Sequence, residues 1–391
     1  MELRLEPGVA FIEGGNGHGK SNLLEAVYML AIAKSSRASS ERELVRRQTT
    51  GDQVHAQVAA TAIRDGSRVK VQIDLVGTPS ALDGTSEGSA PVGPASQQKP
   101  VRFDVQKQLR VNGVQRRSFE AVGEINAVLF TAQDLDLVLG SPSVRRRYMD
   151  ILISQLDHVY LMALQRYQRV LAQRNPLLRS VSSGRARPDE LEYWDSELVE
   201  AGGVLLSRRA MIVDQLSKTA APIYRTLAEH DGDLDIGYRP SVQIDSGIAE
   251  SDAALALREA LEAHRDRELA QGFTLFGPHR DDLQMSLGNT DVALYASRGQ
   301  CRTVVLAMKL AEAAYLKERR GDEPVVLLDD VLSELDTRRR AEVLDMTSQY
   351  EQVFITATDA EHIGEPDISR MWRYVVREGE IESLRGSDAN G

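Results

Sequence analysis

The chain has 391 residues, and its 58 acidic side chains outnumber 47 Lys and Arg side chains, which gives a net charge of −11. A globally acidic chain is not expected to coat nucleic acid indiscriminately, although a local basic surface is compatible with it. A single cysteine, Cys301, excludes an internal disulfide framework, and no run of about 18 apolar residues or secretion leader is visible. We therefore expect a cytoplasmic protein of two or three domains with no contact to a membrane.

A glycine-rich stretch at 14–21 follows the apolar run Val9-Ala10-Phe11-Ile12 and precedes a helix-periodic segment at 22–32. This is G-x-x-x-x-G-K-[ST] between a strand and a helix. Its glycines let backbone N–H groups surround phosphate oxygens, Lys20 reaches the terminal phosphates, and the Ser21 hydroxyl can ligate Mg²⁺. A plain glycine turn is the alternative, which these offsets disfavour. The predicted ATP-binding residues are Gly14, Gly15, Asn16, Gly17, His18, Gly19, Lys20, Ser21 and Asn22.

The rest of the N-terminal third has β patterns. Residues 1–6 alternate like a short strand, and period-2 alternation on both sides of Asp65-Gly66 predicts a hairpin. Asn112-Gly113 predicts another, and 77–100 has the Gly, Ser, Pro and Gln composition of a flexible insertion. We interpret 1–143 as the first half of an α/β nucleotide-binding head with an antiparallel β subdomain.

Helical periodicity dominates 144–270, which we interpret as an inserted helical arm domain. Its first pattern ends at Asn175-Pro176, because proline disfavours a continuing helix. Further helical patterns follow, separated by predicted loops at 182–188 and 231–247. No sustained heptads occur, so the arm is not a long coiled coil.

The second half of the head, 271–391, begins where strand and helix patterns alternate again. Its apolar run 324–328 ends in Asp329 and Asp330, as in a Walker B strand. Beside a P-loop, Asp329 can hold Mg²⁺ through water, and Asp330 can orient or deprotonate an attacking water. Asp330 and Lys20 are therefore the predicted catalytic residues. The segment 333–336 matches a D-loop.

A second anion site is predicted at Ser297-Arg298-Gly299-Gln300, where a serine N-cap precedes a long helical pattern. Alone, this would be a plain capped helix. Placed before the Walker B strand, it matches the ABC signature S-x-G-Q, which assigns Ser297, Gly299 and Gln300 to ATP. In that class the signature caps the γ-phosphate bound to another subunit, so an ATP-dependent homodimer is expected.

With these motifs in place, the sequence resembles the RecF family of SMC-type ATPases over nearly its whole length. The resemblance implies ATP-dependent dimerisation on DNA at single-stranded gaps and junctions with duplex. It also implies loading of a recombinase with a RecR-like mediator in repair, replication restart and the SOS response. The motifs that carry it are 14–26, Asp134-Leu135, Gly140, Arg145-Arg146-Arg147, Gln173-Arg174-Asn175, Trp194-Asp195, 277–282, 296–300, 327–336 and 354–356.

The chain departs from the family pattern at several positions. Gly15 and His18 replace the common Glu and Gln, and family members usually begin further upstream with a turn that contacts the adenine. Gln133 lies where an acidic residue is usual, and we assign it the Mg²⁺ or water role of a Q-loop. Residues 356–358 replace a switch histidine. Together with Asp330 as the base, this predicts a weak DNA-stimulated ATPase that acts as a slow switch.

Candidate DNA contacts are the basic run Arg145-Arg146-Arg147 and Arg37 near the P-loop. Phosphate binding by these side chains would carry no sequence information, and a solvated helix face paired with acids is the open alternative. Only 5% of residues are aromatic, so extensive base stacking is not expected.

Two other functions compete with an ATP-gated DNA clamp. One is the SMC-type ATPase subunit of a DNA-processing nuclease, for which the sequence offers no second metal cluster. The other is a transporter ATPase, which the helical arm and the family motifs disfavour.

Overall fold

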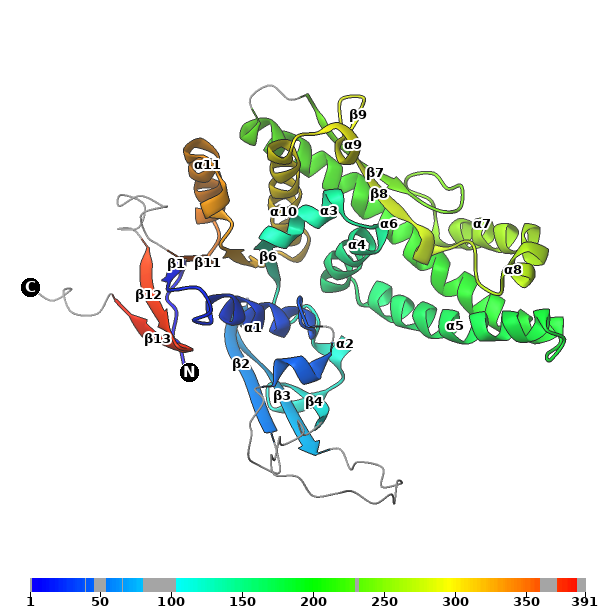
Figure 1. Cartoon of the computed structure of the whole chain (residues 1–391), viewed down its shortest axis with the longest axis horizontal. Helices are drawn as coiled ribbons and strands as arrows, with labels where there is room; N and C mark the ends of the chain where they lie inside the picture. The colour runs from blue at the N-terminus through cyan, green and yellow to red at the C-terminus, as the bar shows by residue number, and fades with distance from the viewer. Residues whose placement is uncertain are drawn as a thin grey trace, which may run out of the picture. The chain divides into compact units, whose positions relative to one another are not determined.

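The structure, a computed structural model, describes residues 2–38, 40–45, 54–64, 66–79, 103–228, 232–358 and 371–384. The chain forms two compact units, one of Met1–Leu24 with Asn126–Gly391 and one of Glu25–Ile125 (Figure 1). Both units combine helices with sheets, so the predicted α/β class is confirmed. The predicted division at 143 and 270 stays a prediction.

A six-stranded sheet forms the centre of the first unit, in the order β13-β12-β1-β11-β10-β6. All neighbours are parallel except β12 and β13, so five strands end at one edge. Their apolar runs are continuous because strands of a parallel sheet are covered on both faces. The strands are β1 (Gly8–Glu13), β6 (Ala127–Thr131), β10 (Val325–Asp329), β11 (Gln352–Ala357), β12 (Trp372–Arg377) and β13 (Glu380–Ser383).

Helices connect and cover these strands. Helix α1 (Lys20–Ile32) follows β1, and α10 (Arg298–Arg320) packs against β6, α4 and α6. Many α10 side chains are buried, which explains its long apolar pattern. The short elements of this unit are η2 (Ala132–Leu135), α3 (Asp136–Leu139), α9 (Val292–Tyr295), η5 (Leu332–Glu334) and α11 (Thr337–Ser348).

The segment predicted as an arm consists mainly of helices. Helices α5 and α6 lie side by side, α7 packs against α6, and α8 packs against α5 (Figure 1). A three-stranded sheet in the order β7-β8-β9 joins them. The elements are α4 (Pro142–Leu156), α5 (His158–Ser182), η3 (Pro188–Glu190), α6 (Leu191–Leu227), β7 (Leu234–Arg239), α7 (Glu250–Ala263), α8 (Arg265–Gln271), η4 (Pro278–Arg280), β8 (Asp282–Leu287) and β9 (Thr290–Asp291).

Three sequence-based element assignments were wrong. Helix α5 continues through Pro176, because Asn175 bonds Thr274 instead of ending the helix and Leu178 beyond it is fully buried. The expected loop 231–247 contains β7, whose short alternating pattern is completed by pairing with β8. Residues 2–6 form no strand, since alternation needs a neighbouring ladder to bond the backbone.

Two adjacent glycines allow α6 and α7 to approach closely. A Cβ atom at Gly202 would lie 2.4 Å from Leu257 Cδ2, and one at Gly203 would lie 2.7 Å from Ala254 Cβ. Glycine is therefore used here for helix packing, despite its cost inside a helix. The sequence pattern does not reveal this role.

A buried ion network holds the segment 277–282 against the helices. The Arg209 guanidinium donates to Asp150 Oδ1 (2.7 Å), Asp281 Oδ2 (3.2 Å) and the Pro278 carbonyl (2.6 Å). Asp281 is fully buried and also accepts from the Tyr238 hydroxyl at 2.5 Å. Because an unpaired buried charge is costly, these partners fix the segment in one conformation.

The second unit contains a four-stranded antiparallel sheet in the order β2-β3-β4-β5. Both predicted hairpins are confirmed, with Arg64 opposite Ser67 and Val111 opposite Val114. Most of the predicted insertion 77–100 lies outside the described residues, but its first positions continue β3. The elements are η1 (Glu41–Leu44), β2 (Val54–Arg64), β3 (Ser67–Pro79), β4 (Phe103–Val111), β5 (Val114–Arg116) and α2 (Ser118–Ala121).

Candidate nucleotide-binding site

The glycine loop lies between β1 and the start of α1, at the carboxyl edge of the central sheet. Lys20 Nζ donates to the carbonyl oxygens of Gly14 (2.6 Å) and Gly15 (3.1 Å). Gly17 and Gly19 have φ of 80° and 106°, which other residues rarely adopt. The loop thus holds its lysine at the centre of a phosphate-sized backbone cradle.

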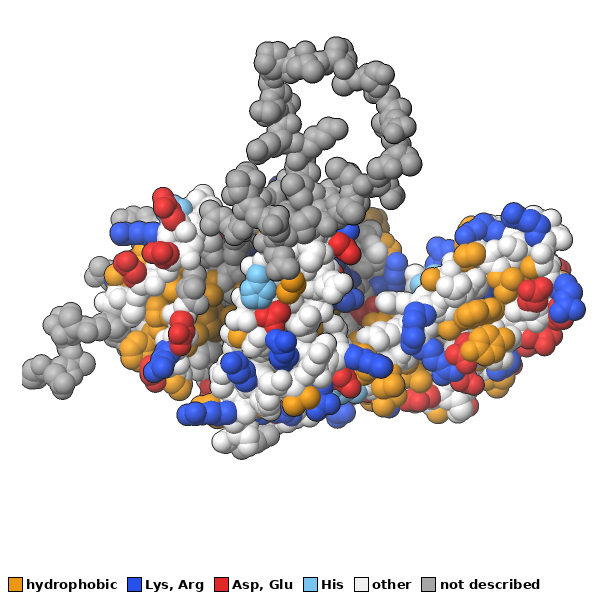
Figure 2. Space-filling view, turned by 90° about the horizontal axis from the view of Figure 1, so that it is seen from below, with side chains coloured by type: hydrophobic (Ala, Val, Ile, Leu, Met, Phe, Trp, Pro, Cys, Tyr) orange, Lys and Arg blue, Asp and Glu red, His pale blue; other side chains and the backbone are white. Residues whose placement is uncertain are grey.

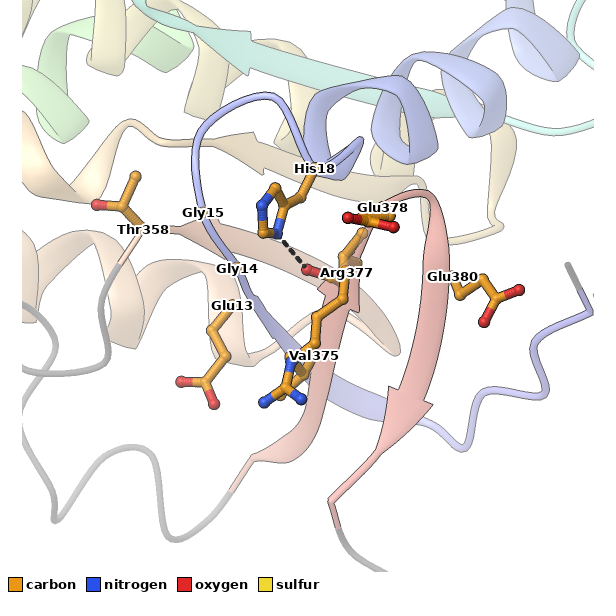
Figure 3. A pocket seen from close by; sticks show the side chains of 10 residues that line it. Glu13, Gly14, Gly15, His18, Thr358, Val375, Arg377, Glu378 and Glu380 are labelled. Carbon is orange, nitrogen blue, oxygen red and sulfur yellow. Dashed lines mark hydrogen bonds between the residues drawn. The ribbon is translucent and has the colours of Figure 1, made fainter.

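The β12–β13 hairpin supports the loop from the C-terminal part of the chain. The His18 ring donates through Nδ1 to the Val376 carbonyl (3.2 Å), and Gly379 N donates to the His18 carbonyl (3.0 Å). Figure 3 shows the His18 ring directed toward this hairpin. A Cβ atom at Gly14 would lie 2.4 Å from Val376 O, so only glycine fits there.

A cavity of about 750 Å³ opens beside the loop and the hairpin (Figure 3). Its charged lining is mostly acidic, with one guanidinium. The side chains that decide its character are Glu13, His18, Thr358, Arg377, Glu378 and Glu380.

The predicted Mg²⁺ ligands Ser21 and Asp329 are in direct contact. Ser21 Oγ donates to Asp329 Oδ1 at 2.8 Å, and the Thr356 hydroxyl donates to the same oxygen at 3.0 Å. Asp329 is opposite both Thr356 of β11 and Thr131 of β6 in the sheet register. A hydroxyl beside a carboxylate at a phosphate loop is the ligand type that Mg²⁺ prefers.

The candidate base Asp330 follows directly in an unusual backbone conformation. Its φ is 55°, and its N–H donates to Thr356 Oγ1 at 3.0 Å. Asp330 Oδ1 is buried and has no hydrogen-bond partner among the described residues. A buried carboxylate oxygen needs a partner, so this atom suits a water or ligand at the nucleotide. The residues present therefore fit a Mg²⁺–nucleotide group.

Gln133 lies on the same edge, in the first turn after β6. Its side chain is exposed. The structure thus brings Lys20, Ser21, Asp329 and Asp330 to one sheet edge, with Gln133 on the neighbouring strand end.

The signature residues cap a different helix. Ser297 Oγ accepts from Gln300 N (3.2 Å), and Gln300 Oε1 accepts from Ser297 N (2.8 Å), which forms a capping box. Within the described ranges no hydrogen bond joins this cap to the glycine loop. Ser297 and Gly299 are exposed at the start of α10, where the helix dipole favours an anion.

Comparison with known proteins identifies the family. The model of the RecF/RecN/SMC N terminal domain matches residues 1–380. "DNA replication and repair protein RecF" of Chloroflexus aggregans is 40% identical, over 97% of this chain and 95% of that protein. The chain belongs to the RecF family.

Other RecF proteins agree with this assignment. The relative from Roseiflexus castenholzii is 38% identical over 97% of this chain and 95% of its own length. A solved "Structure of the recombination mediator protein RecF-ATP in RecFOR pathway" has a TM-score of 0.80 and 28% identity, covering 98% of this chain and 93% of that one. No helix in the described part of the chain is long and apolar enough to cross a membrane.

The DNA candidates of this RecF-family chain differ in availability. Arg145 is buried and donates to both carboxylate oxygens of Asp282 (2.6 and 2.9 Å), so it serves the fold. Arg146 is half-buried and donates to the Asp281 carbonyl at 2.8 Å. Arg147 and Arg37 are exposed. On the face in Figure 2, Lys and Arg side chains are interspersed with Asp and Glu.

Sequence reasoning missed two features of the RecF-family site. Thr356 was noted only as a replacement for a histidine, whereas its hydroxyl contacts both Asp329 and Asp330. The hairpin bonds of His18 were not expected at all. Both depend on strand pairing between distant segments, for which the sequence carries no local signal.

Proposed function

We propose that this protein is an ATP-gated DNA-binding protein of recombinational repair and replication restart. The observation that carries the proposal is the contact of Ser21 with Asp329 beneath the Lys20 loop, in a chain whose signature serine is exposed elsewhere. The solved RecF-ATP relative supports ATP as the nucleotide.

In the proposed site, the glycine loop and Lys20 bind the phosphates, and Ser21, Asp329 and Gln133 hold Mg²⁺. The ion, when bound, neutralises charge on the phosphate oxygens. Asp330 orients the attacking water, since its free carboxylate oxygen is held in place by the bond of its N–H to Thr356. Because Thr356 replaces a switch histidine, hydrolysis is slow and resets the protein rather than driving movement.

ATP joins two copies in the proposed cycle, with Ser297, Gly299 and Gln300 of each copy capping the γ-phosphate of the other. The dimer binds at single-stranded gaps in duplex DNA and helps a RecR-like mediator to load the recombinase. The proposed setting is the cytoplasm during repair and the SOS response. We also propose that 144–270 acts as an arm between head halves 1–143 and 271–391.

Among the described residues, no group of three or more His, Cys, Asp or Glu side chains is arranged to hold a further metal. No observation therefore favours the nuclease-subunit alternative.

Three variants test the proposed roles by nucleotide binding, mass in solution and retention on gapped duplex. Lys20→Ala should lose ATP binding and every later step. Asp330→Asn should keep ATP and accumulate the DNA-bound dimer, because only hydrolysis is blocked. Ser297→Arg should bind ATP but stay monomeric. A Ser297→Arg protein that dimerises normally with ATP would rule out capping in trans.

A further inference from the structure

Large apolar side chains are exposed beside the signature motif. Leu294 and Tyr295 of α9 are each 74% exposed, and Leu139 of α3, which contacts α9, is 48% exposed. Large side chains grouped in this way mark interaction surfaces more often than scattered single residues do. We name Leu139, Leu294, Tyr295 and Arg298 the signature-edge patch.

Chain connectivity limits what can cover this patch. Tyr295 precedes Ser297 by two positions, so their Cα atoms lie within about 7 Å of each other. Leu139 belongs to α3, which directly follows the η2 turn that carries Gln133. Any molecule that places a phosphate on the Ser297 cap must therefore also lie against α9.

The charge of the patch indicates the same occupant. Arg298 is exposed and has no hydrogen bond or ion pair with the described residues, and it lies at the positive end of α10. The cavity beside the glycine loop is lined by Glu13, Glu378 and Glu380 against a single Arg377. ATP bound to that loop adds phosphate charge, so the loop face of a loaded copy is complementary to Arg298.

We propose that the signature-edge patch is the docking surface for the ATP-loaded glycine-loop face of a second copy of this chain. The inference rests on the proposed function and adds the side chains that supply its binding energy. Tyr295 and Leu294 give apolar contact at the centre of the interface, and Arg298 gives its dependence on nucleotide charge. Two-fold symmetry uses the patch twice in each dimer, so one substitution weakens two contacts.

The dimer Kd should be measured by sedimentation velocity in saturating ATP and Mg²⁺. Tyr295→Ser and Leu294→Ser should each raise it by roughly tenfold or more, because truncating an interface anchor costs over about 1 kcal/mol. Tyr295→Phe should preserve it. Tyr193→Ser is the matched control, since Tyr193 of α6 is 64% exposed and distant in sequence from the signature. Nucleotide affinity of the monomer should not change in any variant.

Arg298→Gln should also raise the Kd, and the remaining association should depend less on salt than in the unmodified protein. If Ser297→Arg prevents dimerisation while Tyr295→Ser and Leu294→Ser dimerise as the unmodified protein does, the inference is wrong and the proposed function stands. If the unmodified protein binds ATP without dimerising, both fail. Far-ultraviolet circular dichroism and urea midpoints check that each variant is folded.

Discussion

Thr356→Val removes one hydroxyl that connects both carboxylates of the candidate nucleotide site. The substitution keeps a β-branched side chain in β11, so the strand and its packing should persist. It leaves Asp329 with one fewer donor and the Asp330 N–H without its acceptor. The effect should therefore appear both in stability and in Mg²⁺-dependent nucleotide binding.

The expected magnitude follows from burial. Thr356 is fully buried, and a buried donor left without an acceptor costs about 1–3 kcal/mol. The free energy of unfolding should fall by about this amount in urea titrations. Misplacing Asp329 and Asp330 should also lower the gain in ATP affinity produced by Mg²⁺ by roughly tenfold, equivalent to about 1.4 kcal/mol.

The assay compares ATP affinity in Mg²⁺ with that in EDTA. Thr347→Val is the matched control, because Thr347 is buried in α11 and donates only to helix carbonyls of Val343 and Leu344. The control should lose some stability but keep the full Mg²⁺ effect. An undiminished Mg²⁺ effect in Thr356→Val would refute the assigned role.

Three further predictions concern the segment 277–282. Arg209→Met should lower the free energy of unfolding by about 3–5 kcal/mol in urea titrations, because Asp281 is left buried without its cation. Burial lowers the pKa of His279 to about 4, so the unfolded state binds more protons and stability falls as pH drops from 6.5 toward 4; His279→Gln should flatten this part of a pH series. Gly277→Ala should cost at least about 2 kcal/mol by thermal unfolding, because its φ is 124° and the new Cβ would lie 2.3 Å from Tyr167 Oη.

The sequence was most informative where local chemistry determines structure. The glycine loop, the apolar run that ends at Asp329 and the capped start of α10 each require particular residues at fixed spacing, and all three occur where expected. Parallel strand order then follows from alternating strand and helix patterns.

Long-range pairing explains most of what sequence reasoning missed. His18 and Val376 are 358 positions apart, and only the pairing of β1 with β12 makes their bond possible. Helix α5 passes through Pro176 because tertiary packing of Leu178 outweighs a local helix-ending signal. Arg145 was predicted as a DNA contact from its charge alone, and its pairing with Asp282 depends on the position of β8.

The central claim is that ATP joins two copies of this chain on DNA. Its most direct test is light scattering of the purified protein without nucleotide, with ATP and Mg²⁺, and then with a gapped duplex added. We predict a doubling of mass with ATP that occurs at lower protein concentration when the duplex is present. A mass that stays at one chain, at ATP concentrations where direct titration shows full occupancy, would contradict the account.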